Sequence, residues 1–336
     1  MSTDPADVKS AKRVTLKDVA KAAEVSLASA SYAINGTGSV GDQVRAHVLK
    51  IAEAMCYRQN LSARAMRTGR TGALGLILPD FANPFFTSLA QSVIRSARAQ
   101  GYCVFVTDTE GDPNQERKAM HLMVERGVDG IVWFPIHDLE NGTALINDTP
   151  TVVIDRTVGG IEQVHADYHA GGRLAAEHLV ALGHKRIGVV SGPMSVLSMR
   201  ERCAGAIAFI EQHAGLVFNL TNAFSYDLEA DVRMAIERRD ATAIFAGADL
   251  IALGVIQHAS RTGLRVPDDL SVVGFDDIPW AQISAPPLTT IEMPVEEMAA
   301  EAIDALLRRV ESRAQPRRKV VFETALIERK STSRPL

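Results

Sequence analysis

Acidic residues follow several apolar runs of this sequence, where their side chains could bind a small ligand. Runs such as "TVVIDR" and "LSVVGFDD" end in Asp155 and Asp276, and other runs place Asp80, Asp108 and Asp249 in the same way. In a doubly wound α/β fold the carboxyl ends of the strands meet at one edge, and ligands bind there. Carboxylates at such positions also cap helices, so each of these residues fits either role.

The side chains that could perform catalysis or hold a metal form no recognisable set. The carboxylates are accompanied by no nucleophile–base pair and by no phosphate-binding loop. Four histidines are close together in the sequence, but their spacing fits no metal motif: His165, His169, His178 and His184. The three cysteines are far apart, and we expect them to be small buried hydrophobes. The sequence therefore predicts a protein that is not an enzyme and needs no cofactor.

Length and composition indicate a globular protein of two or three domains. The chain has 336 residues, of which 46% are hydrophobic. Its first residues, "MSTDPADVKSAKR", lack the apolar core of a signal peptide, and no stretch approaches eighteen uncharged apolar residues. We expect a cytoplasmic protein without a membrane segment.

Charge is distributed unevenly along the chain. Residues 1–70 hold eleven Lys and Arg against six Asp and Glu, a net +5, whereas the remainder holds 25 against 34, a net −9. A basic first segment on an acidic body indicates a nucleic-acid-binding module joined to another domain, although a basic surface without a partner is equally common.

Two short amphipathic runs near the start predict a helical hairpin. From Leu16 to Ala23 the apolar residues follow the spacing of one helix face, with Thr15 as N-cap and Asp18 completing a capping box. After a turn, Ser26 caps a second helix that ends at Asn35-Gly36, and residues 44–55 predict a third. This pattern is typical of a helix-turn-helix DNA reader, but a purely structural hairpin remains an alternative.

Beyond residue 72 the pattern changes to apolar strands alternating with helices, which predicts a doubly wound α/β core. Seven strand candidates are too many for one small sheet, and the central segment "TVVIDRTVGGIEQVHADYHAGG" separates them into two groups. Two similar lobes are therefore expected. The segment "RQNLSARAMRTGRTG" between hairpin and core has too little apolar surface to form a helix alone.

The whole chain resembles the LacI family of bacterial transcriptional regulators. The motifs that carry this resemblance are "VTLKDVAKAAEVSLASASYAINGTGSV", "NPFF", "VVIDR", "HLVALGHKRIGVVSGP", "SMRERCAG", "VPDDLSVVGFDDIPWAQISAPPLTTI" and "LIERKSTSRP". The resemblance implies an all-α helix-turn-helix headpiece joined by a hinge helix to a two-lobed core of periplasmic-binding-protein type. Such a protein binds operator DNA and a small effector, and it forms a homodimer.

The domains expected from this resemblance cover the chain as follows. Residues 1–13 are a disordered tail, residues 14–58 the headpiece, residues 59–71 the hinge helix and linker, and residues 72–336 the core. Lobe one takes about 72–165 and 292–322, and lobe two about 166–291 and 323–332.

The resemblance also assigns residues to double-stranded operator DNA. By position Leu27, Ala28 and Tyr32 would read bases, and short polar side chains would contact phosphates: Thr15, Ser26, Ser31 and Asn35. These base readers are uncharged, so they predict contacts to thymine methyls and to shape rather than arginine–guanine pairs. Glu24 stands where the family's turn usually has glycine, which would cost about 1 kcal/mol at positive φ.

The hinge implied by the resemblance would fold on DNA. Asn60 would cap a short helix that includes Ala63, and Met66 would occupy the position of the wedging leucine in the minor groove. A solvated basic linker is the alternative interpretation of this segment.

The family's effector site lies between the lobes, and its anchors correspond to Asp155, Arg200 and Asp276, with Asp249 beside them. Aromatic faces would come from Phe81, Phe85 and Tyr226. Carboxylates that accept from vicinal hydroxyls beside an aromatic surface favour a sugar or sugar derivative, and a nucleobase or another metabolite is the alternative ligand. A sugar-binding transport protein of the same fold is a more distant alternative.

Dimerisation would involve residues 83–97 and the helix near residues 296–310. No leucine heptads follow the core, so we expect a dimer and not a tetramer.

Overall fold

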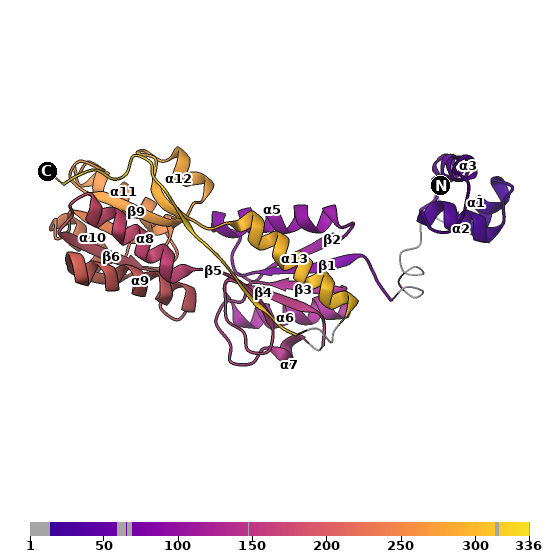
Figure 1. The fold of residues 1–336 in the computed structure, drawn as a ribbon, viewed down its shortest axis with the longest axis horizontal. Coiled ribbons are helices and arrows are strands. Elements are labelled where there is room, and N and C mark those ends of the chain that lie inside the picture. Colours follow the sequence, from indigo (N-terminus) through magenta and orange to yellow (C-terminus); the bar gives the residue numbers. More distant parts are fainter. Residues whose placement is uncertain (1–13, 59–64, 66–68, 147, 313–315, 336) are drawn as a thin grey trace, which may run out of the picture. The chain divides into compact units, whose positions relative to one another are not determined.

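The computed structural model describes residues 14–58, 65, 69–146, 148–312 and 316–335. The chain divides into two compact units, residues 1–71 and 72–336, which are described separately below (Figure 1). The expected tail 1–13 and the hinge residues Asn60, Ala63 and Met66 lie outside the described residues. Within the described residues, every helix is too short or too polar to span a bilayer.

The first unit contains the three expected helices, α1 (Leu16–Ala22), α2 (Leu27–Asn35) and α3 (Asp42–Ala54). Helices α1 and α2 begin directly after their predicted caps, whereas α3 begins two residues before the predicted run and has no side-chain cap. Thr15 and Asp18 form a reciprocal capping box on α1, and the Ser26 hydroxyl accepts from the Ser29 backbone N–H at 3.0 Å. Gly36 ends α2 at φ 68°. The predicted helix-turn-helix is confirmed.

Small side chains allow these helices to pack closely. The buried core of the unit consists of Val19, Ala20, Ala23, Ala30, Ala33, Val48 and Ala52. Alanines at the crossing of α1 and α2 let the two backbones approach, because no bulky group separates them. The turn between the two helices places Glu24 at φ 54°, so the strain expected at this position is present.

Lobe one of the second unit is built on a six-stranded parallel sheet in the order β11-β5-β4-β3-β1-β2. Its strands are β1 (Ala73–Leu78), β2 (Cys103–Asp108), β3 (Gly130–Trp133), β4 (Thr151–Ile154), β5 (Glu162–Ala166) and β11 (Lys319–Phe322). Helices α5 (Pro84–Ala99) and α13 (Val295–Glu311) share one apolar cluster with Leu74, Leu76 and Val132. Helix α6 (Pro113–Glu125) packs with Ile77 and Trp133 in another cluster, and the short α7 is Thr143–Ile146.

Lobe two has a second six-stranded sheet in the order β12-β10-β9-β8-β6-β7. Its strands are β6 (Arg186–Ser191), β7 (Gly215–Thr221), β8 (Ala243–Ala246), β9 (Ser271–Asp276), β10 (Thr289–Glu292) and β12 (Ala325–Ile327). All pairs are parallel except β10 with β12. The helices are α8 (Tyr168–Ala181), α9 (Leu197–His213), α10 (Ala230–Glu237), α11 (Asp249–Arg261) and α12 (Pro279–Ile283). The predicted two-lobed doubly wound core is confirmed.

In the described residues the chain passes between the lobes three times (Figure 1). It crosses from β5 to α8, from β10 to α13, and from β11 to β12. Three adjacent crossings allow the lobes to rotate about a shared hinge without unfolding either sheet.

The cysteines only partly follow the expectation of burial. Cys203 on α9 is buried, and burial raises its pKa to about 11, whereas Cys56 and Cys103 are exposed. The expectation was wrong for these two because Cys56 follows the end of α3 and Cys103 opens an edge strand, where little chain covers them.

Candidate DNA-binding face and effector cleft

The outer face of α2 presents two large apolar side chains to solvent. Leu27 is 52% exposed and Tyr32 is 46% exposed, and Ala28 lies beside them, also exposed. Ser31 and Asn35 are half-buried on the same helix, where the Asn35 amide donates to the Ser31 carbonyl at 2.7 Å. The exposed face formed by Leu27, Ala28 and Tyr32 is uncharged, so it could meet base edges and methyl groups but not form ion pairs.

The orientation of Tyr32 depends on a glycine that the sequence did not indicate as functional. Gly38 lies in the turn after α2 at φ +72°, and a Cβ built on it would be 2.7 Å from the Tyr32 Cγ. The aromatic ring therefore packs directly against the glycine backbone. A side chain at position 38 would have to displace the ring, since the closest real Cβ contacts are longer than this.

The candidate phosphate contacts at the helix starts also serve as caps. The Thr15 hydroxyl donates to Asp18 Oδ2 at 2.7 Å, and the Ser26 and Ser29 hydroxyls are 2.8 Å apart. Both Thr15 and Ser26 are exposed, so a DNA phosphate could reach them. The Ser26 hydroxyl caps as an acceptor and can still donate to a phosphate, whereas the Thr15 hydroxyl has one hydrogen and would have to exchange Asp18 for the phosphate.

The core has a small cavity between the lobes at the carboxyl ends of the strands. Its volume is about 30 Å³. Residues of both lobes line it: Asn83, Phe85, Phe86, Phe134, Asp155, Arg156, Ser198, Met199, Arg202, Phe224 and Asp276. A space of this volume holds only a few water molecules, so a metabolite requires the lobes to separate or its polar groups to replace those already paired.

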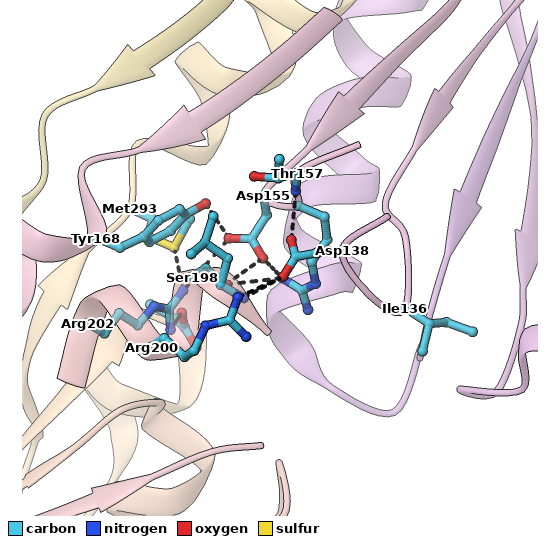
Figure 2. A network of polar contacts seen from close by, with 12 residues as sticks. Ile136, Asp138, Asp155, Thr157, Tyr168, Ser198, Arg200, Arg202 and Met293 are labelled. Atoms are coloured by element: carbon cyan, nitrogen blue, oxygen red, sulfur yellow. Dashed lines mark hydrogen bonds and ion pairs between the residues drawn. The ribbon is translucent and has the colours of Figure 1, made fainter. Parts of the chain in front are cut away.

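A buried polar network crosses this cavity from lobe to lobe (Figure 2). Asp155 follows β4 of lobe one, and its carboxylate accepts from Tyr168 Oη and, at 3.3 Å, from Ser198 Oγ, both of lobe two. Arg156 forms an ion pair with Asp155 and donates to Ser198 Oγ at 3.2 Å. These contacts satisfy Asp155 within the protein, as a buried carboxylate requires.

A second buried ion pair lies on the lobe two side of the cavity. Arg202 Nη1 is 2.8 Å from Asp276 Oδ1 and 2.9 Å from the Gly247 carbonyl, and its guanidinium stacks 4.0 Å from the centre of the Phe275 ring. Burial raises the pKa of Asp276 to about 6, although Arg202 opposes this shift. Burial also lowers the pKa of Arg156 to about 10. The cleft therefore offers paired charges that a polar ligand could reorganise.

The structure brings together three of the residues proposed for the effector: Phe85, Asp155 and Asp276. Phe81 and Tyr226 lie outside the cavity lining and are 36% and 53% exposed. Asp249 is fully buried, and accepts from the Thr290 hydroxyl at 2.6 Å and from the Ile278 N–H at 2.9 Å. Burial raises its pKa well above the usual range, which fits a structural acceptor at the start of α11.

Arg200 also lies outside the lining of this cavity, so its contact with an effector stays a prediction. Its side chain is 44% exposed, and its guanidinium donates to the Met194 carbonyl at 2.9 Å. Residues two apart on a helix point in directions about 200° apart, so Arg200 and Arg202 cannot both face the cavity. Arg202 lies four residues after Ser198, on the same face of α9, and both line the cavity.

Known protein families match the headpiece and the core separately. Residues 15–60 match "Bacterial regulatory proteins, lacI family", and residues 176–332 match "Periplasmic binding protein-like domain". The HTH-type transcriptional regulator DegA of Bacillus subtilis is 34% identical over 333 residues, which cover 96% of this chain and 98% of DegA. The chain belongs to the LacI family.

Other members of the LacI family are similar over nearly the same length. The HTH-type transcriptional repressor PurR of Aliivibrio salmonicida is 31% identical, with 94% of this chain and 98% of PurR covered. The crystal structure of the Lac repressor dimer bound to operator and the anti-inducer ONPF matches with a TM-score of 0.82 and 25% identity, covering 96% of this chain and all of that one. The described helix-turn-helix and two-lobed core are thus the family's architecture.

Proposed function

We propose that this LacI-family chain is a cytoplasmic, homodimeric repressor that binds a pseudo-palindromic operator and responds to a sugar-like effector in the cleft. The observation that carries the DNA-binding part is the exposed outer face of α2, with Leu27 and Tyr32 projecting from a rigid, well-capped helix. A recognition helix of this kind enters a major groove. The similarity to regulators over nearly the full chain supports the same function.

The proposed base contacts are apolar or neutral. Leu27 and Ala28 would meet thymine methyl groups, and the Tyr32 hydroxyl would reach a base edge or a phosphate. Thr15, Ser26, Ser31 and Asn35 would donate to phosphates and set the register. Three further residues have roles implied by the family that remain proposals: Asn60 as the hinge cap, Ala63 as a DNA contact in the hinge, and Met66 as the wedge in the minor groove.

Substitution of Tyr32 tests base reading. An operator is first selected from random duplex DNA with the full chain, and affinity for it is then compared with affinity for unrelated DNA at fixed salt. Tyr32→Ala should weaken operator binding by about tenfold or more and nonspecific binding much less, since a specific contact is worth about 1–3 kcal/mol. Leu49→Ala is the matched control, because Leu49 is 46% exposed on α3 of the same headpiece. Equal losses on both DNAs would contradict base reading by Tyr32.

The proposed effector is a sugar or sugar derivative. Asp155, Asp276 and Arg202 supply acceptors and donors that match neighbouring hydroxyl groups, and Phe85 supplies apolar surface for C–H groups. A nucleobase acting as corepressor is the second candidate, favoured by the similarity to proteins named PurR. Any effector can act only by binding one lobe arrangement more tightly than the other.

The fluorescence anisotropy of a labelled operator identifies the effector and shows whether it acts as an inducer or as a corepressor. A panel of monosaccharides, disaccharides and nucleobases is added to the full chain on its selected operator; release indicates an inducer and tighter binding a corepressor. Ser198→Ala should reduce sensitivity to the active compound, because Ser198 lines the cavity, whereas Phe81→Ala should not. The opposite pattern would show that the ligand occupies another site.

Dimerisation is proposed through lobe one. Helices α5 and α13 pack against each other there, and Arg95 Nη2 is 2.7 Å from Glu296 Oε1. Light scattering of the full chain should give the mass of a dimer. A monomer or tetramer mass would refute the proposed state.

A further inference from the structure

Helix α9 begins without a cap from its own side chains. Val196 occupies the N-cap position, and no side-chain hydrogen bond is formed by it. The first N–H groups of a helix have no acceptor within the helix, and a helix of 17 residues also carries partial positive charge at this end. An acceptor, preferably an anionic one, is therefore required from elsewhere in the fold.

Asp138 of the other lobe supplies this acceptor (Figure 2). Its Oδ2 accepts from the Leu197 backbone N–H at 2.6 Å, and lies 3.7 Å from the Arg200 guanidinium. Its Oδ1 accepts from the Thr157 backbone N–H at 2.8 Å. The Asp138 side chain is only 19% exposed. One carboxylate thus joins two backbone N–H groups from different lobes.

The two hydrogen bonds of the Asp138 carboxylate lead to different lobes. Thr157 follows β4, so its bond holds Asp138 on lobe one, whereas Leu197 starts α9 of lobe two. The capping bond can therefore exist only when the lobes are together. The same first two turns of α9 carry Ser198 and Arg202 into the cleft.

We propose that Asp138 is a positioning residue that caps α9 across the cleft and thereby stabilises the closed arrangement, in which the two lobes are together. The arrangement of the proposed effector cleft is set by this cap together with the cavity residues. Arg200, half-exposed, neutralises the carboxylate from the solvent side and contributes less. This inference concerns the regulation of the cleft and so rests on the proposed function, but its test uses neither DNA nor effector.

The lobe-to-lobe distance measures closure directly. Spin labels are placed at Lys118→Cys on α6 and Arg261→Cys on α11, both exposed, after Cys56 and Cys103 are replaced by serine. Labelled chains are diluted with unlabelled ones, so that only distances within one chain are observed by double electron–electron resonance. The full chain is used throughout.

Asp138→Ala should lower the closed-to-open ratio about tenfold, as expected from the loss of a helix cap, and a longer distance should appear in the distribution. Asp138→Asn should act in the same direction, because its amide nitrogen cannot accept from a second N–H. Asp112→Ala is the matched control: Asp112 caps α6 within lobe one, accepting from the Asn114 N–H at 2.8 Å.

The control separates lobe closure from general stability. Both alanine variants should lower the melting temperature, but only those at Asp138 should change the distance distribution. An unchanged distribution in Asp138→Ala and Asp138→Asn would overturn the proposal, and so would an equal change in Asp112→Ala. Since operator binding is measured separately, a failure of the proposed DNA function would leave this result interpretable.

Discussion

Replacing Arg202 by methionine should destabilise the core strongly and in a pH-dependent manner. The side chains of Arg202 and Asp276 are only 5% and 8% exposed, and their ion pair is 2.8 Å long. Removal of the guanidinium leaves the carboxylate buried without its cation, which typically costs about 3–5 kcal/mol of unfolding free energy. Methionine keeps most of the volume over the Phe275 ring, so lost packing contributes little.

The pH dependence follows from the protonation of Asp276. Burial already raises the pKa of this carboxyl to about 6 while Arg202 lowers it, so the pKa must rise further when Arg202 is removed. At pH 8 the variant has to bury a charge or take up a proton, whereas at pH 5 the carboxyl is already neutral. The penalty of Arg202→Met should therefore be clearly smaller at pH 5 than at pH 8.

Urea unfolding of the full chain, followed by far-UV circular dichroism at both pH values, measures this penalty. Adding Asp276→Asn to Arg202→Met should recover more than half of it at pH 8, because no buried charge remains. Arg265→Met is the control: it breaks an exposed pair with Asp269, whose pKa the Arg265 hydrogen bonds lower to about 2, so no titration occurs in this range. A penalty below about 1 kcal/mol at pH 8, or no recovery in the double variant, would refute the role given to this pair.

Three further predictions concern single positions. Glu24→Gly should stabilise the headpiece by about 1 kcal/mol, because φ 54° is costly for a glutamate but not for glycine. The measurement is the melting temperature, which should rise. A lower melting temperature would show that contacts of the Glu24 side chain outweigh the backbone strain. Gly38→Ala should displace the Tyr32 ring and weaken operator binding, and unchanged affinity would mean that Tyr32 does not read DNA in this orientation. Folding raises the pKa of Asp276, so this carboxyl stabilises the fold at low pH, and the contribution is lost as the pH rises through about 6. In urea titrations between pH 4 and 7, Asp276→Asn should therefore reduce the fall of the unfolding free energy with pH. An unchanged pH dependence would show that other groups cause it.

Local signals in the sequence were sufficient for the headpiece. The capping box of Thr15 and Asp18, the Ser26 cap and the Asn35-Gly36 ending each depend on residues within four positions of one another. Such short-range interactions are readable without knowledge of the fold. The strain at Glu24 was also predicted, and the backbone angle confirms it.

The strands were predicted in part. The seven apolar runs are "ALGLILPD", "CVFVTDT", "GIVWFPI", "TVVIDR", "RIGVVSGP", "AIFAGAD" and "LSVVGFDD". They became β1 to β4, β6, β8 and β9, whereas β5, β7, β10, β11 and β12 were not identified. Strand β7 has alternating exposed and half-buried residues and lies at a sheet edge, and β12 has only three residues. A short or edge strand forms because a partner strand is present, and that partner is distant in the sequence.

The sequence by itself determined the headpiece, the two-lobed class and the presence of carboxylates at strand ends. The tertiary structure decided which of those carboxylates face the cleft, with Asp155 and Asp276 in its lining and Asp249 enclosed behind it. It also placed Arg202, and not Arg200, in the lining of the cavity, and joined Asp138 to α9 of the other lobe. These outcomes depend on the rotation of α9 and on contacts between residues more than fifty positions apart, where burial and partner geometry, and not local propensity, set the energy.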